Sequence, residues 1–208
     1  MALITTHIRF ALDLADRFAI SDMDAYISGT VYPDSRWVSG IDRELTHHER
    51  FRSPDFPTSD FTRGWQIHCV CDEIQNQLFA AQFPEQIPIS PEQRWVQLSV
   101  AKLVQDMNDL QQFDLRAGLS HLDHVGNPNG EDIKLVQSFY RIIRQAYHHH
   151  SVPTPQAYKQ LWLDVGLSEA LANQIIQDLK TRLQDQPWIT SVHSTYDKMI
   201  DIAGNQTL

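Results

Sequence analysis

The stretch SDFTRGWQIHCVCDEIQNQLFAAQ, residues 59–82, determines the expected fold. Thr58 or Ser59 is expected to cap its start, and the residues around a histidine and an aspartate four residues apart are largely apolar. That spacing places His68 and Asp72 on one face of a helix, one turn apart. Gly64 lies one turn before His68 on the same face and would let another element approach closely. We therefore expect a long buried helix that presents two ligand-type side chains to a neighbouring element.

Helical periodicity continues along most of the chain, and strand alternation is nearly absent. Thr5 or Thr6 is expected to cap the first helix. The helices are expected at about 5–19, 21–32, 59–82, 90–111, 131–149, 155–164, 168–184 and 187–202, with polar loops at 33–57 and 117–130. The prediction is an all-α bundle of about seven or eight helices.

The stretch SVPTP, residues 151–155, is the best candidate for a domain boundary. It would divide the chain into a metal-binding helical domain, residues 1–150, and a C-terminal helical extension, residues 151–208. Whether the extension packs on the same core is left open by the sequence.

The balance of charges limits the classes of partner. Among 208 residues, 17 lysines and arginines face 26 aspartates and glutamates, which gives a formal net charge of −9. Duplex nucleic acid and anionic membranes bind to cationic surfaces, so neither is expected as a partner. A small phosphoester remains compatible, because a bound divalent cation supplies its own positive charge.

The sequence also bears on the cellular compartment. The two cysteines, Cys69 and Cys71, are separated by one residue and would point to different faces of a helix, so no disulfide is expected between them. The N-terminal residues lack the pattern of a secretory signal, and no apolar run is long enough for a transmembrane helix. These features predict a cytoplasmic protein, and they leave its oligomeric state undetermined.

A second stretch, YPDSRWVSGIDRELTHH at residues 32–48, is rich in possible metal ligands. Asp34 follows a proline at the expected end of a helix, and His47 or His48 comes thirteen or fourteen residues later. Together with the pair on the long helix, these side chains would form a shell of two carboxylates and two imidazoles. Such a shell suits Zn²⁺, Fe²⁺ or Mn²⁺, and the lack of thiolates disfavours a structural zinc site.

Other interpretations of these residues stay open. His68 and Asp72 would also satisfy one another as an ordinary buried hydrogen-bonded pair. His7 lies beside the apolar stripe of the first helix, where it would be either a further ligand or a polar residue at a helix start.

Four motifs occur in an order that resembles the zinc-dependent phospholipase C and P1 nuclease superfamily. They are THIRFA, GTVYPD, RELTH and GWQIHCVCD, and they cover about residues 6–75. The resemblance is closest to the short bacterial members, and it implies an all-α fold. It also implies that one metal ion is held by Asp34, His47, His68 and Asp72. His7 would help to hold a neighbouring, looser ion, with Asp72 bridging the two.

The chain departs from this family in two places. The secreted enzymes use an N-terminal tryptophan as a ligand, whereas this chain begins at Met1, six residues before His7. They also carry a histidine about ten residues after the one equivalent to His68, where this chain has Leu78. One or two ions are therefore expected rather than three. His121 and His124 would either replace the missing ligands or belong to a polar loop between helices.

The function expected from these features is that of a metal-dependent hydrolase of the phosphoesterase type. Asp34 would orient or deprotonate the attacking water. Arg36 and Arg43 would bind a substrate phosphate, or pair with Asp34 and Asp42 instead. Two alternatives remain: an HD-type phosphohydrolase, which needs an adjacent His-Asp dipeptide that the chain lacks, and a non-catalytic helical protein with a structural metal site.

Overall fold

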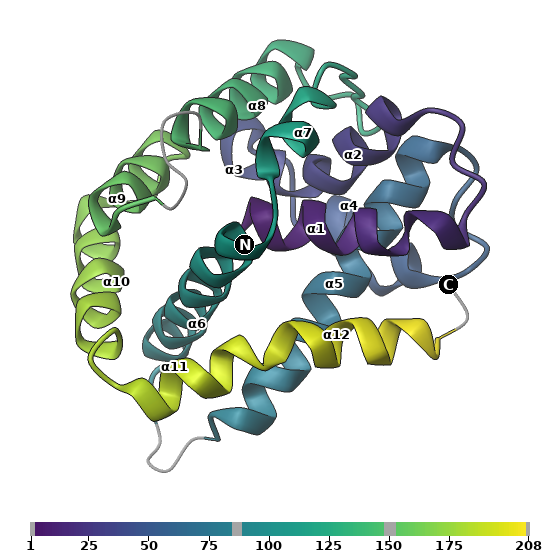
Figure 1. Ribbon diagram of the computed structural model, residues 1–208. Coiled ribbons are helices and arrows are strands. Elements are labelled where there is room, and N and C mark those ends of the chain that lie inside the picture. The colour runs from purple at the N-terminus through teal and green to yellow at the C-terminus, as the bar shows by residue number, and fades with distance from the viewer. Residues whose placement is uncertain (1–2, 85–88, 148–152, 207–208) are drawn as a thin grey trace.

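The computed structural model describes residues 3–84, 89–147 and 153–206, and these residues form an all-α protein without strands (Figure 1). Its longer helices are α1 (Ile4–Leu14), α2 (Met23–Val31), α5 (Asp60–Gln82), α6 (Pro91–Gln112), α8 (Ile133–Tyr147), α9 (Pro155–Asp164), α10 (Glu169–Arg182), α11 (Gln186–His193) and α12 (Thr195–Gly204). None of the helices in the described part of the chain has the length and apolar character that crossing a membrane requires.

The described residues contain twelve α-helical segments, more than the seven or eight expected, because short helices form where loops were predicted. The segment 33–57 contains η2 (Tyr32–Ser35), α3 (Arg36–Ser39), α4 (Glu44–His47) and η3 (Glu49–Arg52). Likewise α7 (Leu115–Ser120) occupies the start of the second predicted loop, 117–130, and the helix expected at 187–202 is interrupted at Ser194. A helix of one turn is too short to show a hydrophobic period, so sequence patterning does not detect it.

Helix α1 lies in the middle of the molecule and packs against α2, α5 and α6, while α8, α9 and α10 form an arc along one side of the molecule, with α10 against α6 (Figure 1). The predicted threonine cap is wrong. Leu3 occupies the N-cap position, and no side chain caps the helix. The buried Thr5 and Thr6 instead contact α6, since the Thr5 amide donates to Asp106 and the Thr6 hydroxyl donates to Asp109. These two bonds attach the start of α1 to α6.

Helices α2 and α5 cross in backbone contact. A Cβ added at Gly64 on α5 would overlap the carbonyl oxygen of Tyr26 on α2, and one added at Gly29 on α2 would overlap that of Phe61 on α5. Each helix therefore contributes one glycine to the crossing, as the position of Gly64 predicted.

Asp106 joins the C-terminal helices to the rest of the protein. Its carboxylate accepts hydrogen bonds from the Thr5 amide on α1, from the hydroxyl of Tyr147 on α8 and from that of Tyr158 on α9. Helices α9 and α10 also pack together, and α10 lies against α6. Burial raises the pKa of Asp106 to about 6, although its hydrogen bonds act in the opposite direction.

Gly64→Ala should destabilise the protein by at least about 1–3 kcal/mol, because backbone atoms of α2 leave no room for a methyl group. Gly204→Ala is the matched control: this glycine also lies in a helix, but a Cβ there meets nothing within 4 Å. The control should change stability by no more than about 1 kcal/mol. Urea denaturation of both variants measures the difference, and equal stabilities would refute the close crossing.

Asp106 should make stability fall as the pH rises. Its pKa is higher in the folded than in the unfolded chain, so the folded state binds more protons between about pH 4 and pH 6. The corresponding stability is present at low pH and is lost as the pH rises through the folded pKa. Asp106→Asn should remove this contribution. Unfolding free energies of the metal-free wild type and variant, compared across that range, should differ in slope; parallel profiles would exclude the effect.

Candidate metal centre

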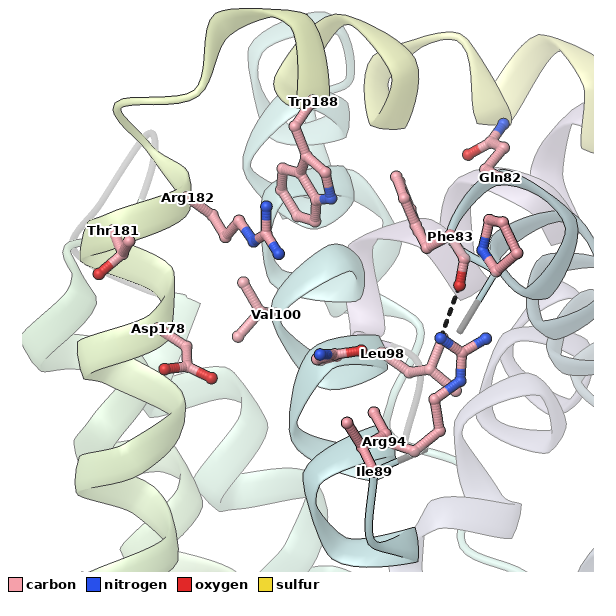
Figure 2. A pocket seen from close by; sticks show the side chains of 12 residues that line it. Gln82, Phe83, Ile89, Arg94, Leu98, Val100, Asp178, Thr181, Arg182 and Trp188 are labelled. Atoms are coloured by element: carbon pink, nitrogen blue, oxygen red, sulfur yellow. Dashed lines mark hydrogen bonds between the residues drawn. The ribbon is translucent and has the colours of Figure 1, made fainter. Parts of the chain in front are cut away.

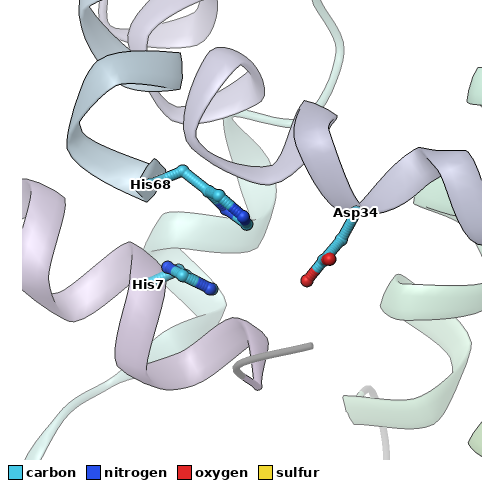
Figure 3. A group of neighbouring side chains, drawn as sticks. All are labelled: His7, Asp34 and His68. Carbon is cyan, nitrogen blue, oxygen red and sulfur yellow. The ribbon is translucent and has the colours of Figure 1, made fainter. Parts of the chain in front are cut away.

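Five side chains from four elements converge in the interior and are called the His–Asp centre below. They are His7 of α1, Asp34 of η2, His47 of α4, and His68 and Asp72 of α5. Figure 3 shows His7 and His68 lying one over the other, with the carboxylate of Asp34 pointing toward the same space. The two stacked rings have centroids 3.9 Å apart. The spacing of His68 and Asp72 does place both on one face, and their Nε2 and Oδ2 atoms are 4.0 Å apart.

The separations between the candidate donor atoms suit one small cation. The Nε2 atoms of His47 and His68 are 3.1 Å apart, and Nε2 of His47 lies 3.8 Å from Oδ1 of Asp34 and 3.8 Å from Oδ2 of Asp72. Donor atoms of a tetrahedral zinc site lie ~3.4 Å from each other, given bonds of about 2.0–2.2 Å. The observed separations lie on both sides of that value. These buried groups could therefore hold a metal ion.

Hydrogen bonds outside the centre orient its two nearest imidazoles. Nδ1 of His68 lies 2.8 Å from the carbonyl oxygen of Thr30, which can only accept, so this nitrogen carries the proton and Nε2 keeps a lone pair. Nδ1 of His47 lies 2.7 Å from the hydroxyl of Thr46, which itself donates to the carbonyl oxygen of Arg43. In this arrangement Nδ1 of His47 donates to the hydroxyl. Two lone pairs then face each other across 3.1 Å, and a cation between them removes their repulsion.

The protein environment keeps all three imidazoles neutral, as metal ligands must be. Burial and the neighbouring His68 lower the pKa of His47 to about 2. Burial also lowers the pKa of His68, and burial and His68 hold the pKa of His7 well below its ordinary value. A proton is therefore a poor substitute for a metal ion at this site near neutral pH.

Two members of the centre lack the hydrogen bonds that buried polar groups normally make. Both ring nitrogens of His7 and both carboxylate oxygens of Asp34 are buried, and they have no hydrogen-bond partner in the described part of the chain. Leaving a buried carboxylate without a partner is costly. A metal ion between these groups would satisfy them.

Sequence reasoning missed the residues that place His47. On α5, the indole of Trp65 donates a hydrogen bond of 2.7 Å to the carbonyl oxygen of Thr46, and the Cys69 thiol donates to the same oxygen. These bonds hold α4 against α5 and bring His47 beside His68. No periodic signal marks them, because both donors occur in an otherwise ordinary apolar run.

Lys102 was also missed. It lies on α6, is buried, and places its Nζ 3.3 Å from Oδ1 of Asp72. Burial alone would raise the pKa of Asp72, but the Lys102 ammonium and the other nearby groups hold it well below its ordinary value. Asp72 is therefore charged and available at neutral pH.

Other predicted residues lie elsewhere. His48 is exposed and its Nδ1 accepts from the Arg50 amide, so the second histidine of the pair points away. His121 pairs with Asp24 at 2.6 Å, and the exposed His124 lies against the ring of Phe61. The structure thus does not bring His121 or His124 to the centre. Three further histidines, at positions 148–150, lie outside the described residues.

The two arginines predicted to bind phosphate differ in setting. Arg36 lies two residues after Asp34 and is partly buried. Its Nε has no hydrogen-bond partner in the described structure, and its guanidinium lies over Trp37. Burial lowers the pKa of Arg36, whereas Asp34 raises it. Arg43 is exposed one turn before His47.

A separate pocket of about 720 Å³ opens between the C-terminal end of α5, α6, α10 and α11 (Figure 2). The rings of Phe83 and Trp188 stack in it, and the guanidinium of Arg94 donates to the carbonyl oxygen of Phe83. Among the described residues that line it there is one carboxylate, Asp178, and no imidazole. The pocket therefore lacks the ligand types that the His–Asp centre combines.

Comparisons of the chain with models of protein families, with curated proteins and with solved structures give no match. The chemistry of the centre must accordingly be inferred from its own residues.

His47→Ala should abolish tight zinc binding, whereas His48→Ala should retain it, because only the first of these imidazoles faces the other donors. Zinc content after dialysis, together with calorimetric titration of the metal-free proteins, measures the difference. Loss of binding in the His48 variant alone would overturn the assignment.

Proposed function

We propose that the protein is a metal-dependent hydrolase of the phosphoesterase type, with its ion at the His–Asp centre. The observation that most directly supports the ion is the set of buried, unpartnered atoms on His7 and Asp34, next to the facing Nε2 atoms of two neutral imidazoles. Imidazole and carboxylate donors without thiolate suit Zn²⁺, Fe²⁺ or Mn²⁺. When bound, such an ion lowers the pKa of a water molecule and stabilises negative charge on phosphoryl oxygens.

Asp34 is the best candidate for the general base. Both of its oxygens are free of hydrogen-bond partners in the described structure, so one can contact the ion while the other accepts a proton from water. Its neighbour Arg36 supplies a positive charge with an unpartnered Nε. A guanidinium in this setting suits a phosphate oxygen of a small phosphoester, and Arg43 would add charge at the exposed side of His47.

The order of the four motifs supports the hydrolase class. The resemblance to the zinc-dependent phospholipase C and P1 nuclease superfamily rests on residues that the fold brings together: three histidines and two aspartates from distant parts of the sequence. The HD-type alternative has no such support, because the chain lacks the His-Asp dipeptide.

The second candidate function is a structural metal site in a non-catalytic protein. The depth of the centre favours it: the side chains of His47 and Asp72 are only 5% and 9% exposed. A structural ion is closed off by protein ligands, whereas a catalytic ion keeps a position for water. The two candidates therefore predict the same metal content and different reactivity.

Zinc-loaded protein should hydrolyse bis(p-nitrophenyl) phosphate or p-nitrophenyl phosphate, and Asp34→Asn should lower kcat by at least about 100-fold through loss of the base. His48→Ala is the control and should retain activity, since His48 lies outside the centre. Metal content is measured on the same samples. Stoichiometric zinc without hydrolysis of either ester would favour the structural alternative.

A further inference from the structure

The geometry of the His–Asp centre bears on how many ions it holds. Two overlapping sets of three side chains could each surround an ion, namely His7–Asp34–His68 and His47–His68–Asp72. They share His68, whose Nδ1 donates to the Thr30 carbonyl oxygen and whose Nε2 alone remains as a ligand atom. One lone pair binds one ion. The two sets therefore cannot both be filled through His68.

A second ion would need His7 together with a carboxylate oxygen that the first ion leaves free, either the second oxygen of Asp34 or the far oxygen of Asp72. The two oxygens of Asp72 face different groups. Oδ2 lies 3.8 Å from Nε2 of His47 and 4.0 Å from Nε2 of His68, on the side of the first ion. Oδ1 lies 3.8 Å from Nε2 of His7 and 3.3 Å from Nζ of Lys102. The place where a bridging carboxylate would bind a second ion already has an ammonium group.

We propose that the Lys102 ammonium takes the place of a second metal ion, so that the centre binds a single ion. The inference rests on the proposed metal centre and adds its stoichiometry. Lys102 is buried, and Asp72 is its one ion-pair partner in the described part of the chain. A divalent ion bound to Oδ1 would face this fixed positive charge at close range, in surroundings that screen charge poorly. His7 then belongs to the single centre rather than to a second, looser site.

Lys102 also has a positive role in this arrangement. Its Nζ holds Oδ1 of Asp72, which leaves Oδ2 turned toward the two imidazoles. Lys102 is thus a positioning residue that acts through Asp72. Its removal should free Oδ1 and take away the repulsion, and a second ion should then bind between Asp72 and His7.

The test is the number of zinc ions bound by the folded protein, measured by native mass spectrometry and calorimetric titration. The wild type should bind one ion per chain, and Lys102→Met should bind two. Lys159→Met is the matched control, because Lys159 also forms a 3.3 Å ion pair, with Glu169 on α10, far along the chain from the centre. The control should bind one ion. In the double variant Lys102→Met/His7→Ala, the second ion should be lost again.

The outcomes separate this inference from the proposed function. No zinc in the wild type would refute the metal centre itself. One ion in both the wild type and Lys102→Met, or two ions in the wild type, would overturn the role of Lys102 and leave the metal centre intact. If Lys102→Met does not fold, Lys102→Gln removes the same charge while keeping a polar contact to Asp72, and the same criteria apply.

Discussion

The close crossing of α2 and α5 is the constraint on which the centre depends. With glycines at positions 29 and 64, the two backbones touch, and the carbonyl oxygen of Thr30 reaches Nδ1 of His68. Asp34 follows only four residues after Thr30, so the same contact fixes where its carboxylate enters the interior. Each glycine costs its helix about 1 kcal/mol relative to alanine. That cost is offset by the close packing of α2 and α5, which larger residues would prevent. A wider separation of the two helices would move Asp34 away from His68.

Burying the polar side chains of the His–Asp centre is unfavourable unless each has a hydrogen-bond or ion-pair partner, and only some of them have one. Asp72 has Lys102, and His68 has the Thr30 carbonyl. Asp34 and His7 have no such partner in the described residues. The metal-free protein therefore carries an unfavourable contribution that an ion would remove, which couples metal binding to folding stability. A fold selected only for stability would be expected to replace these two residues with apolar ones of similar size.

The parts of the centre that the sequence could predict are those marked by a pattern within a single helix. His68 and Asp72 follow from helical spacing alone. The convergence of Asp34 and His47 with them was expected from the ligand-type side chains of the loop and from the order of the four motifs. Helical spacing could not predict it, because a loop sequence does not indicate where the loop packs against a helix. Thr5 and Thr6 were misread because the same hydroxyl that caps a helix can bond to a distant carboxylate, and the sequence does not rank the two uses.

The sequence around Lys102 contains a helical pattern of charged residues, but such a pattern has a more common interpretation. Lys102, Asp106 and Asp109 are spaced four and three residues apart, so they share one face of α6. Such a charged stripe is normally assigned to solvent. Here Asp106 accepts a hydrogen bond from the Thr5 amide of α1, and Asp109 accepts one from the Thr6 hydroxyl. Lys102 donates to Asp72 on α5. Helix α6 therefore positions His7, through α1, and also supplies the cation beside Asp72.

Because Tyr158 on α9 donates a hydrogen bond to Asp106 and α10 packs on α6, the C-terminal helices help to fix α6 in place. Their contribution to the centre is thus mechanical: they hold the element that sets both its geometry and its charge.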